Sequence, residues 1–301
     1  MSIVLAFLTA VLWGFGNVFQ KQGMTTSFPK ITLRKFFSQI PTIIKTLFTN
    51  WLWLIGTSMM AVGAVLYVVA LGLGGDVSVV QPILCLAVVV SALVGVIWLK
   101  EKVNGLEWFG IFTVFVGVAM VSVVKSSGGS SMPGVMPTVI FFSTVAGLAG
   151  AAFLLGRIGI SQEFSLAVSA GLAFGLANLS VATLMILFNS FDAAVPLFPV
   201  RVIGLLTAFP LYGIIVFNLL GSAFYQTAFA NGRASIVASV CTIIGNTVPI
   251  IAAVMILGEK ISVFHAVGII VVLAGAIVLA IGNRNQTVAQ MASQSPGSVR
   301  P

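Results

Sequence analysis

The sequence contains nine long apolar runs, and each is close to the roughly 20 residues that a helix needs to cross the hydrocarbon core of a bilayer. Hydrophobic residues make up 59% of the chain, charged residues 7%, and the mean hydropathy is +1.17. The runs are continuous and do not alternate, so they favour helices over barrel strands. We therefore predict an all-α, polytopic membrane helix bundle with spans at 3–22, 51–74, 76–99, 106–125, 137–157, 164–188, 205–230, 233–257 and 261–282.

The basic residues predict the orientation of these spans. The net charge of +8 would suggest nucleic acid in a soluble protein, but here the lysines and arginines stand at the ends of apolar runs, so no nucleic-acid partner is expected. If loops 21–50, 100–105, 158–163 and 231–233 and the tail lie on the same side of the membrane, that side holds every lysine and arginine except Lys125, Arg201 and Lys260. We predict that the protein lies in the cell (inner or plasma) membrane. The positive-inside rule then places the C-terminus in the cytoplasm and the N-terminus outside.

Segment 31–49 is amphipathic, which leaves two interpretations open. It can lie on the cytoplasmic surface with its basic stripe toward anionic lipid. Alternatively, it can form a tenth span whose polar stripe faces an internal cavity. The distribution of charge favours the interfacial helix.

A shift of 158 residues aligns the chain with itself and predicts an internal repeat. The shift pairs Glu101 and Lys102 with Glu259 and Lys260, residue types that are scarce in this chain. Five predicted spans separate the two glutamates, so the copies point in opposite directions. We predict inverted repeats at 1–125 and 126–283, followed by a disordered cytoplasmic tail at 284–301 whose composition is rich in Ser, Gln and Pro.

The repeated pattern of Leu-x-Glu, a short turn and a helix with Gly-x6-Gly resembles the EamA-like branch of the drug/metabolite transporter (DMT) superfamily. The motif "LWGFGN" in the first run and Pro249, ten residues before Glu259, fit the same pattern. The resemblance implies a ten-helix architecture of two inverted halves that moves small metabolites or drugs. The amphipathic segment 31–49 departs from it and resembles the NIPA-like magnesium transporters.

Polar and small residues inside the predicted spans are the candidate substrate site, because buried polar groups in membranes usually face a pathway. Trp13, Gly14 and Asn17 share or flank one helix face, whereas Gln20 and Lys21 are expected at the membrane edge. Pro249 frees the carbonyl of Gly245 beside Asn246 and predicts a kinked polar midpoint. The remaining candidates are the repeat-related Tyr67 and Tyr225, together with Gln81, Asn178 and Gln226, while helix packing is the alternative for each.

Several classes of function are disfavoured by what the spans lack. No acidic residue is expected at mid-membrane, which weakens a proton relay and a divalent-cation site. Glu259 is expected to be solvated and to cap a loop, and the single histidine, His265, to be structural. No catalytic constellation, cofactor or metal site is predicted, so we do not expect an enzyme. The bilayer and a small-molecule substrate are the expected partners, and a homodimer is left open. The function that we predict is secondary transport or export of a small polar metabolite or drug. The alternatives are magnesium transport and a membrane scaffold without transport.

Overall fold

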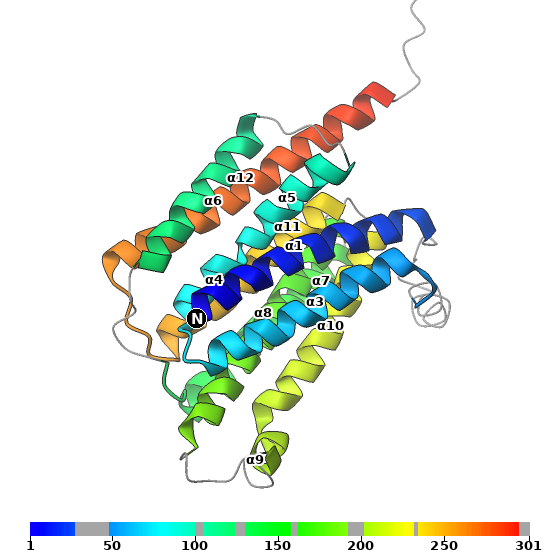
Figure 1. The fold of residues 1–301 in the computed structure, drawn as a ribbon. Helices are drawn as coiled ribbons and strands as arrows, with labels where there is room; N and C mark the ends of the chain where they lie inside the picture. Colours follow the sequence, from blue (N-terminus) through cyan, green and yellow to red (C-terminus); the bar gives the residue numbers. More distant parts are fainter. Residues whose placement is uncertain are drawn as a thin grey trace, which may run out of the picture.

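The computed structural model describes residues 1–27, 48–99, 105–123, 130–157, 162–191, 202–231 and 234–294. Within these ranges the chain is a bundle of helices whose long axes run roughly alongside one another (Figure 1). The helices are α1 (Ser2–Ser27), α3 (Trp51–Gly72), α4 (Val77–Leu84), α5 (Leu86–Leu99), α6 (Gly105–Val123), α7 (Val135–Arg157), α8 (Gln162–Ser190), α9 (Val202–Thr207), α10 (Phe209–Asn231), α11 (Ala234–Met255) and α12 (Val263–Gln294).

The helices are long and apolar enough for a membrane. Among the described residues, six apolar stretches of at least 18 residues lie in α1, α3, α4–α5, α7, α8 and α10, and three shorter apolar stretches lie in α6, α11 and α12. These nine stretches correspond one for one to the nine predicted runs. The prediction of an all-α, polytopic membrane bundle is confirmed.

Helix boundaries differ from the predicted spans at three places. Run 76–99 is divided at Cys85 into α4 and α5, because Pro82 cannot donate a hydrogen bond to the turn before it. Run 205–230 is divided at Ala208 into α9 and α10, ahead of Pro210. Helix α12 continues to Gln294, into the tail for which we predicted disorder, since no Gly or Pro stands between Gly282 and Pro296 to stop it.

Helices α1 and α3 form an antiparallel pair joined at one end. The side-chain amide of Asn50, the residue before α3, donates to the carbonyl of Gly23 near the end of α1 at 2.7 Å. The amphipathic segment 31–49 connects these helices, and its residues 31–47 lie outside the described part of the chain.

Helix packing recurs with the same 158-residue offset as the sequence. Helix α1 packs on α3 and on α4–α5, and α8 packs on α10 and α11 in the same manner. Helices α6 and α12 pack on each other (Figure 1) through a reciprocal contact. A Cβ atom at Gly117 would lie 2.6 Å from the backbone nitrogen of Val272, and one at Gly275 would lie 2.7 Å from that of Val114. Glycine is required at both positions because the two backbones touch.

Candidate substrate cavity

A central cavity of about 350 Å³ lies between α1, α3, α8, α10 and α11, with one residue of α5 in its wall. Its wall is made of amides, hydroxyls, aromatic rings and small residues. The lining residues are Trp13, Asn17, Gln20, Thr57, Met60, Ala61, Ala64, Ala87, Phe174, Asn178, Asn218, Ser222, Tyr225, Gln226, Cys241, Thr242, Gly245 and Asn246. A cavity of this size and composition can hold a small organic molecule.

Six of the nine residues predicted from the sequence line this cavity: Trp13, Asn17, Asn178, Tyr225, Gln226 and Asn246. They come from four helices that are far apart in the sequence. Tyr225 donates its phenol hydrogen to the side-chain oxygen of Asn17 at 3.2 Å, across 208 positions of the chain. The hydrogen bond ties α10 to α1 at the wall of the cavity.

Pro249 lies inside α11, and the carbonyl that it leaves without a helical donor has a partner. The side-chain amide of Asn178 donates to the carbonyl of Gly245 at 3.4 Å. The neighbouring Asn246 is 2% exposed and donates to the sulfur of Cys85 at 3.6 Å. Next to Pro249, α11 therefore presents polar groups that make hydrogen bonds with α8 and with the α4–α5 junction.

Tyr67 and Gln81 lie behind the cavity wall. Gln81 donates its side-chain amide to the Tyr67 hydroxyl at 2.6 Å, and that hydroxyl donates to the backbone carbonyl of Asn178 at 3.2 Å. Tyr67 is 2% exposed and Gln81 is fully buried. Both residues form a buried polar layer beside Asn178, which is part of the cavity wall.

Gly14 also lies outside the cavity, where it brings α1 against α5. A Cβ atom there would lie 2.5 Å from the Cβ of Val90 and 3.0 Å from the carbonyl of Ala87. The hydroxyl of Ser91 donates to the Gly14 carbonyl at 3.1 Å. The glycine therefore sets the distance between the helices and is not available to a ligand.

Comparison with known proteins supports the resemblance inferred from the sequence. Residues 1–123 match the sequence model of the EamA-like transporter family, which is not a family of enzymes. The first part of this multi-pass membrane protein is therefore similar to the EamA-like transporters.

One curated relative of this chain is a protein of Arabidopsis thaliana named "Probable magnesium transporter NIPA9". The two sequences are 23% identical over 299 residues, which cover 93% of this chain and 80% of the relative. No solved structure matches the sequence.

Gln20 is a cavity residue that we did not predict as part of the substrate site. Its side chain is 5% exposed, lines the cavity and donates to the hydroxyl of Thr57 at 2.9 Å. It lies three residues before the end of the apolar stretch Ser2–Gly23.

The internal repeat identifies further residues of the cavity wall. In four pairs of repeat partners, 158 positions apart, both members line the cavity: Gln20 and Asn178, Met60 and Asn218, Ala64 and Ser222, and Ala87 and Gly245. An apolar member such as Ala64 carries no signal alone, but its polar partner Ser222 marks the position.

Two aromatic contacts beside the cavity each involve one tyrosine of the repeat pair Tyr67 and Tyr225. The ring of Trp13 lies 6.1 Å from that of Tyr67, and the ring of Phe174 lies 6.0 Å from that of Tyr225. Trp13 and Phe174 are 161 positions apart, so they are not repeat partners. Of the two tyrosines, only Tyr225 lines the cavity.

The end of the bundle where α4 begins contains a buried carboxylate, which we call the Glu259 cap. The two side-chain oxygens of Glu259 accept hydrogen bonds from the backbone nitrogens of Val77 and Ser78, each at 2.8 Å, and Ser130 donates its hydroxyl to the same carboxylate. Glu259 is 3% exposed, so the expectation that it is solvated is wrong. Its predicted capping role is confirmed, although the helix that it caps, α4, begins 182 positions away.

His265 supports the same end of α4. Pro82 leaves the carbonyl of Ser78 without its helical donor, and the His265 Nε2 atom lies 3.0 Å from that oxygen. The ring is fully buried. It serves structure, as predicted.

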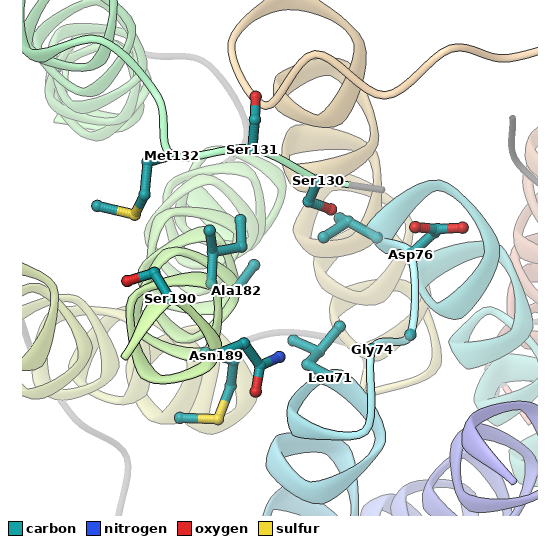
Figure 2. A pocket seen from close by; sticks show the side chains of 13 residues that line it. Leu71, Gly74, Asp76, Ser130, Ser131, Met132, Ala182, Asn189 and Ser190 are labelled. Atoms are coloured by element: carbon teal, nitrogen blue, oxygen red, sulfur yellow. The ribbon is translucent and has the colours of Figure 1, made fainter. Parts of the chain in front are cut away.

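Figure 2 shows a second hollow, of about 340 Å³, beside the Glu259 cap. It lies between the end of α3, the start of α4, residues 130–132 and the last turns of α8, and its labelled wall includes Leu71, Ser130 and Asn189. Among the residues that the structure describes, no three His, Cys, Asp or Glu side chains come together as a metal site.

Proposed function

We propose that this protein is a secondary transporter or exporter that moves a small polar metabolite or drug by alternating access through the central cavity. The observation that carries the proposal is the position of the cavity between residues related by the repeat. A site shared by two related halves can be exposed to either face when one half rocks against the other.

The proposal includes two inverted repeats, residues 1–125 and 126–283. Support comes from the reciprocal contact of α6 with α12, in which Gly117 and Val114 exchange roles with Gly275 and Val272. Further support comes from the equivalent packing of α1 and α8. Helix α7 stands between the set α1 to α6 and the equivalent set α8 to α12. This one additional crossing would make the two sets run in opposite directions through the membrane.

The proposal also includes an orientation with the C-terminus in the cytoplasm. The cavity extends from Asn178 and Asn246 toward the end of the bundle where α1 and α10 end and α11 begins. The basic residues near that end favour the cytoplasm. The cavity of this structure would then face the cytoplasm, with the Glu259 cap on the outer side.

Solute flux in proteoliposomes tests the proposed function. Asn246→Leu removes a polar group from the cavity and Trp13→Ala removes an aromatic wall, so both should lower the rate of flux at least about tenfold. Ile215→Ala is a matched control because Ile215 is 49% exposed and does not line the cavity. Full transport by both cavity variants would refute the site, and a scaffold protein would move no solute at all.

Magnesium transport is the second candidate, favoured by the name of the Arabidopsis relative. Against it stands the chemistry of the cavity, whose described lining contains no carboxylate. Magnesium prefers carboxylate and water oxygens and gives up its water reluctantly. Flux of Mg²⁺ that continues without any organic solute would favour this candidate over the first.

A further inference from the structure

We propose that the central cavity recognises a protonated organic amine with a flat apolar body. The inference rests on the proposed transport function and names the substrate class of the same cavity. It follows from three observations: the direction in which the cavity amides point, the aromatic walls, and the charge of the described lining.

Three cavity amides each donate one hydrogen to the protein. Asn178 donates to the Gly245 carbonyl at 3.4 Å, and Asn218 donates to the Ile214 carbonyl at 2.8 Å. A carbonyl can only accept, so these contacts fix which end of each amide is the nitrogen. Gln20 likewise donates to Thr57. The oxygens of these amides are left for a ligand, and an oxygen-lined wall suits a ligand that donates.

Gln226 supplies an acceptor that the protein leaves unused. Its side-chain oxygen is buried and has no hydrogen-bond partner within the described part of the chain, although the side chain lines the cavity. An unpaired buried oxygen is costly, so such an atom is a candidate ligand contact. An ammonium group offers three donors and no acceptor, which matches this wall.

Aromatic rings form the rest of the recognition surface. Trp13 is held in place because its ring nitrogen donates to the Met60 carbonyl at 3.1 Å. Phe174 and Tyr225 stand at an interplanar angle of 78°. Ring faces attract cations and stack on flat apolar groups, so both parts of an aromatic amine find a partner.

The lining disfavours anions and zwitterions. None of the described lining residues is lysine, arginine, histidine, aspartate or glutamate. A carboxylate or phosphate would find no cationic side chain there and would meet the oxygens of Asn178, Asn218 and Gln226, so much of its desolvation would go uncompensated. The volume of about 350 Å³ is near the lower end of the range for ligand pockets, which limits the ligand to a small molecule.

Binding to the purified full chain in detergent tests the proposal with four matched probes. They are 2-phenylethylamine (cation), 2-phenylethanol (neutral), 3-phenylpropionate (anion) and phenylalanine (zwitterion). We expect the amine to bind at least about tenfold more tightly than each of the other three, a difference of about 1.4 kcal/mol. Equal or tighter binding of any other probe overturns the proposal, and so does the absence of amine binding.

Two variants at one position separate recognition from folding. Gln226→Leu should weaken amine binding about tenfold, because a hydrogen bond to a charged group is lost. Gln226→Glu should tighten amine binding about tenfold at neutral pH by placing a carboxylate beside the ammonium group. Weaker or unchanged amine binding by a folded Gln226→Glu protein would contradict the assignment.

Flux measurements keep this inference distinct from the transport proposal. If the anion or the neutral alcohol crosses proteoliposomes and the amine does not, the substrate class is wrong and the transport function stands. If none of the probes or metabolites crosses, the transport function fails as well.

Discussion

Replacement of Glu259 should loosen the closed end of the bundle by a predictable amount. Its carboxylate accepts from Val77 and Ser78 at 2.8 Å each, and these two residues are 1% and 0% exposed. Glu259→Ala leaves two buried backbone donors without a partner, at roughly 1–3 kcal/mol each. Removal of the carboxylate also relieves the cost of burying its charge, which reduces the net effect. We expect Glu259→Ala to lower the free energy of unfolding by about 2–4 kcal/mol.

The hollow of about 340 Å³ beside the Glu259 cap is lined by Val77 and Ser130. Water that enters it can accept from the backbone donors of α4, which would bring the destabilisation by Glu259→Ala toward about 2 kcal/mol. Glu259→Gln keeps one acceptor oxygen and turns an amide nitrogen toward the other donor, so it should cost less than Glu259→Ala. Val263→Ala is the control, because Val263 is 82% exposed on the neighbouring helix α12.

Thermal unfolding of the purified protein in detergent measures this difference. At roughly 2 °C per kcal/mol for a chain of this size, Glu259→Ala should lower the Tm by about 4–8 °C and Glu259→Gln by less. Val263→Ala should change it by no more than about 1 °C. A Glu259→Ala protein as stable as the control would refute the assignment of the carboxylate as the cap of α4.

Three other perturbations test the packing and the kink. Gly14→Ala should destabilise the protein by about 1–3 kcal/mol in thermal unfolding, because its Cβ would lie 2.5 Å from that of Val90; Gly147→Ala, with nothing within 4 Å, should be neutral or stabilising. Pro249→Ala restores a backbone donor that competes with Asn178 for the Gly245 carbonyl, so stability should rise by about 1 kcal/mol while solute flux falls; unchanged flux would show that the kink serves packing alone. His265→Phe leaves the Ser78 carbonyl unpaired and should cost about 1–3 kcal/mol; an unchanged Tm would show that the carbonyl has found another donor.

The bundle could be predicted because its dominant signal is local. A run of about 20 apolar residues needs no partner to be recognised as a span. Residues such as Trp13, Asn178 and Gln226 could likewise be chosen as cavity residues, because polar and amphipathic side chains stand out in an apolar helix.

Contacts between distant helices could not be predicted in the same way. Tyr67 and Gln81 satisfy the criterion for a cavity residue as well as Tyr225 does, and only packing shows that they form a closed layer. The burial of Glu259 depends on two backbone nitrogens of α4, and nothing in the local sequence of either partner reveals that pairing. Gln20 was not predicted as a site residue because Lys21 beside it marks the end of the apolar run, and only packing shows that the cavity reaches this far along α1.

Side-specific labelling of the cavity tests the central claim most directly. Ser222 lines the cavity, so Ser222→Cys in a protein whose Cys85 and Cys241 are replaced by alanine provides a single reporter. In sealed, oriented vesicles a membrane-impermeant maleimide should label this cysteine from either face, and Glu259→Gln should speed labelling from the face of the Glu259 cap while slowing it from the other. Labelling from one face only, in both backgrounds, would contradict alternating access through this cavity.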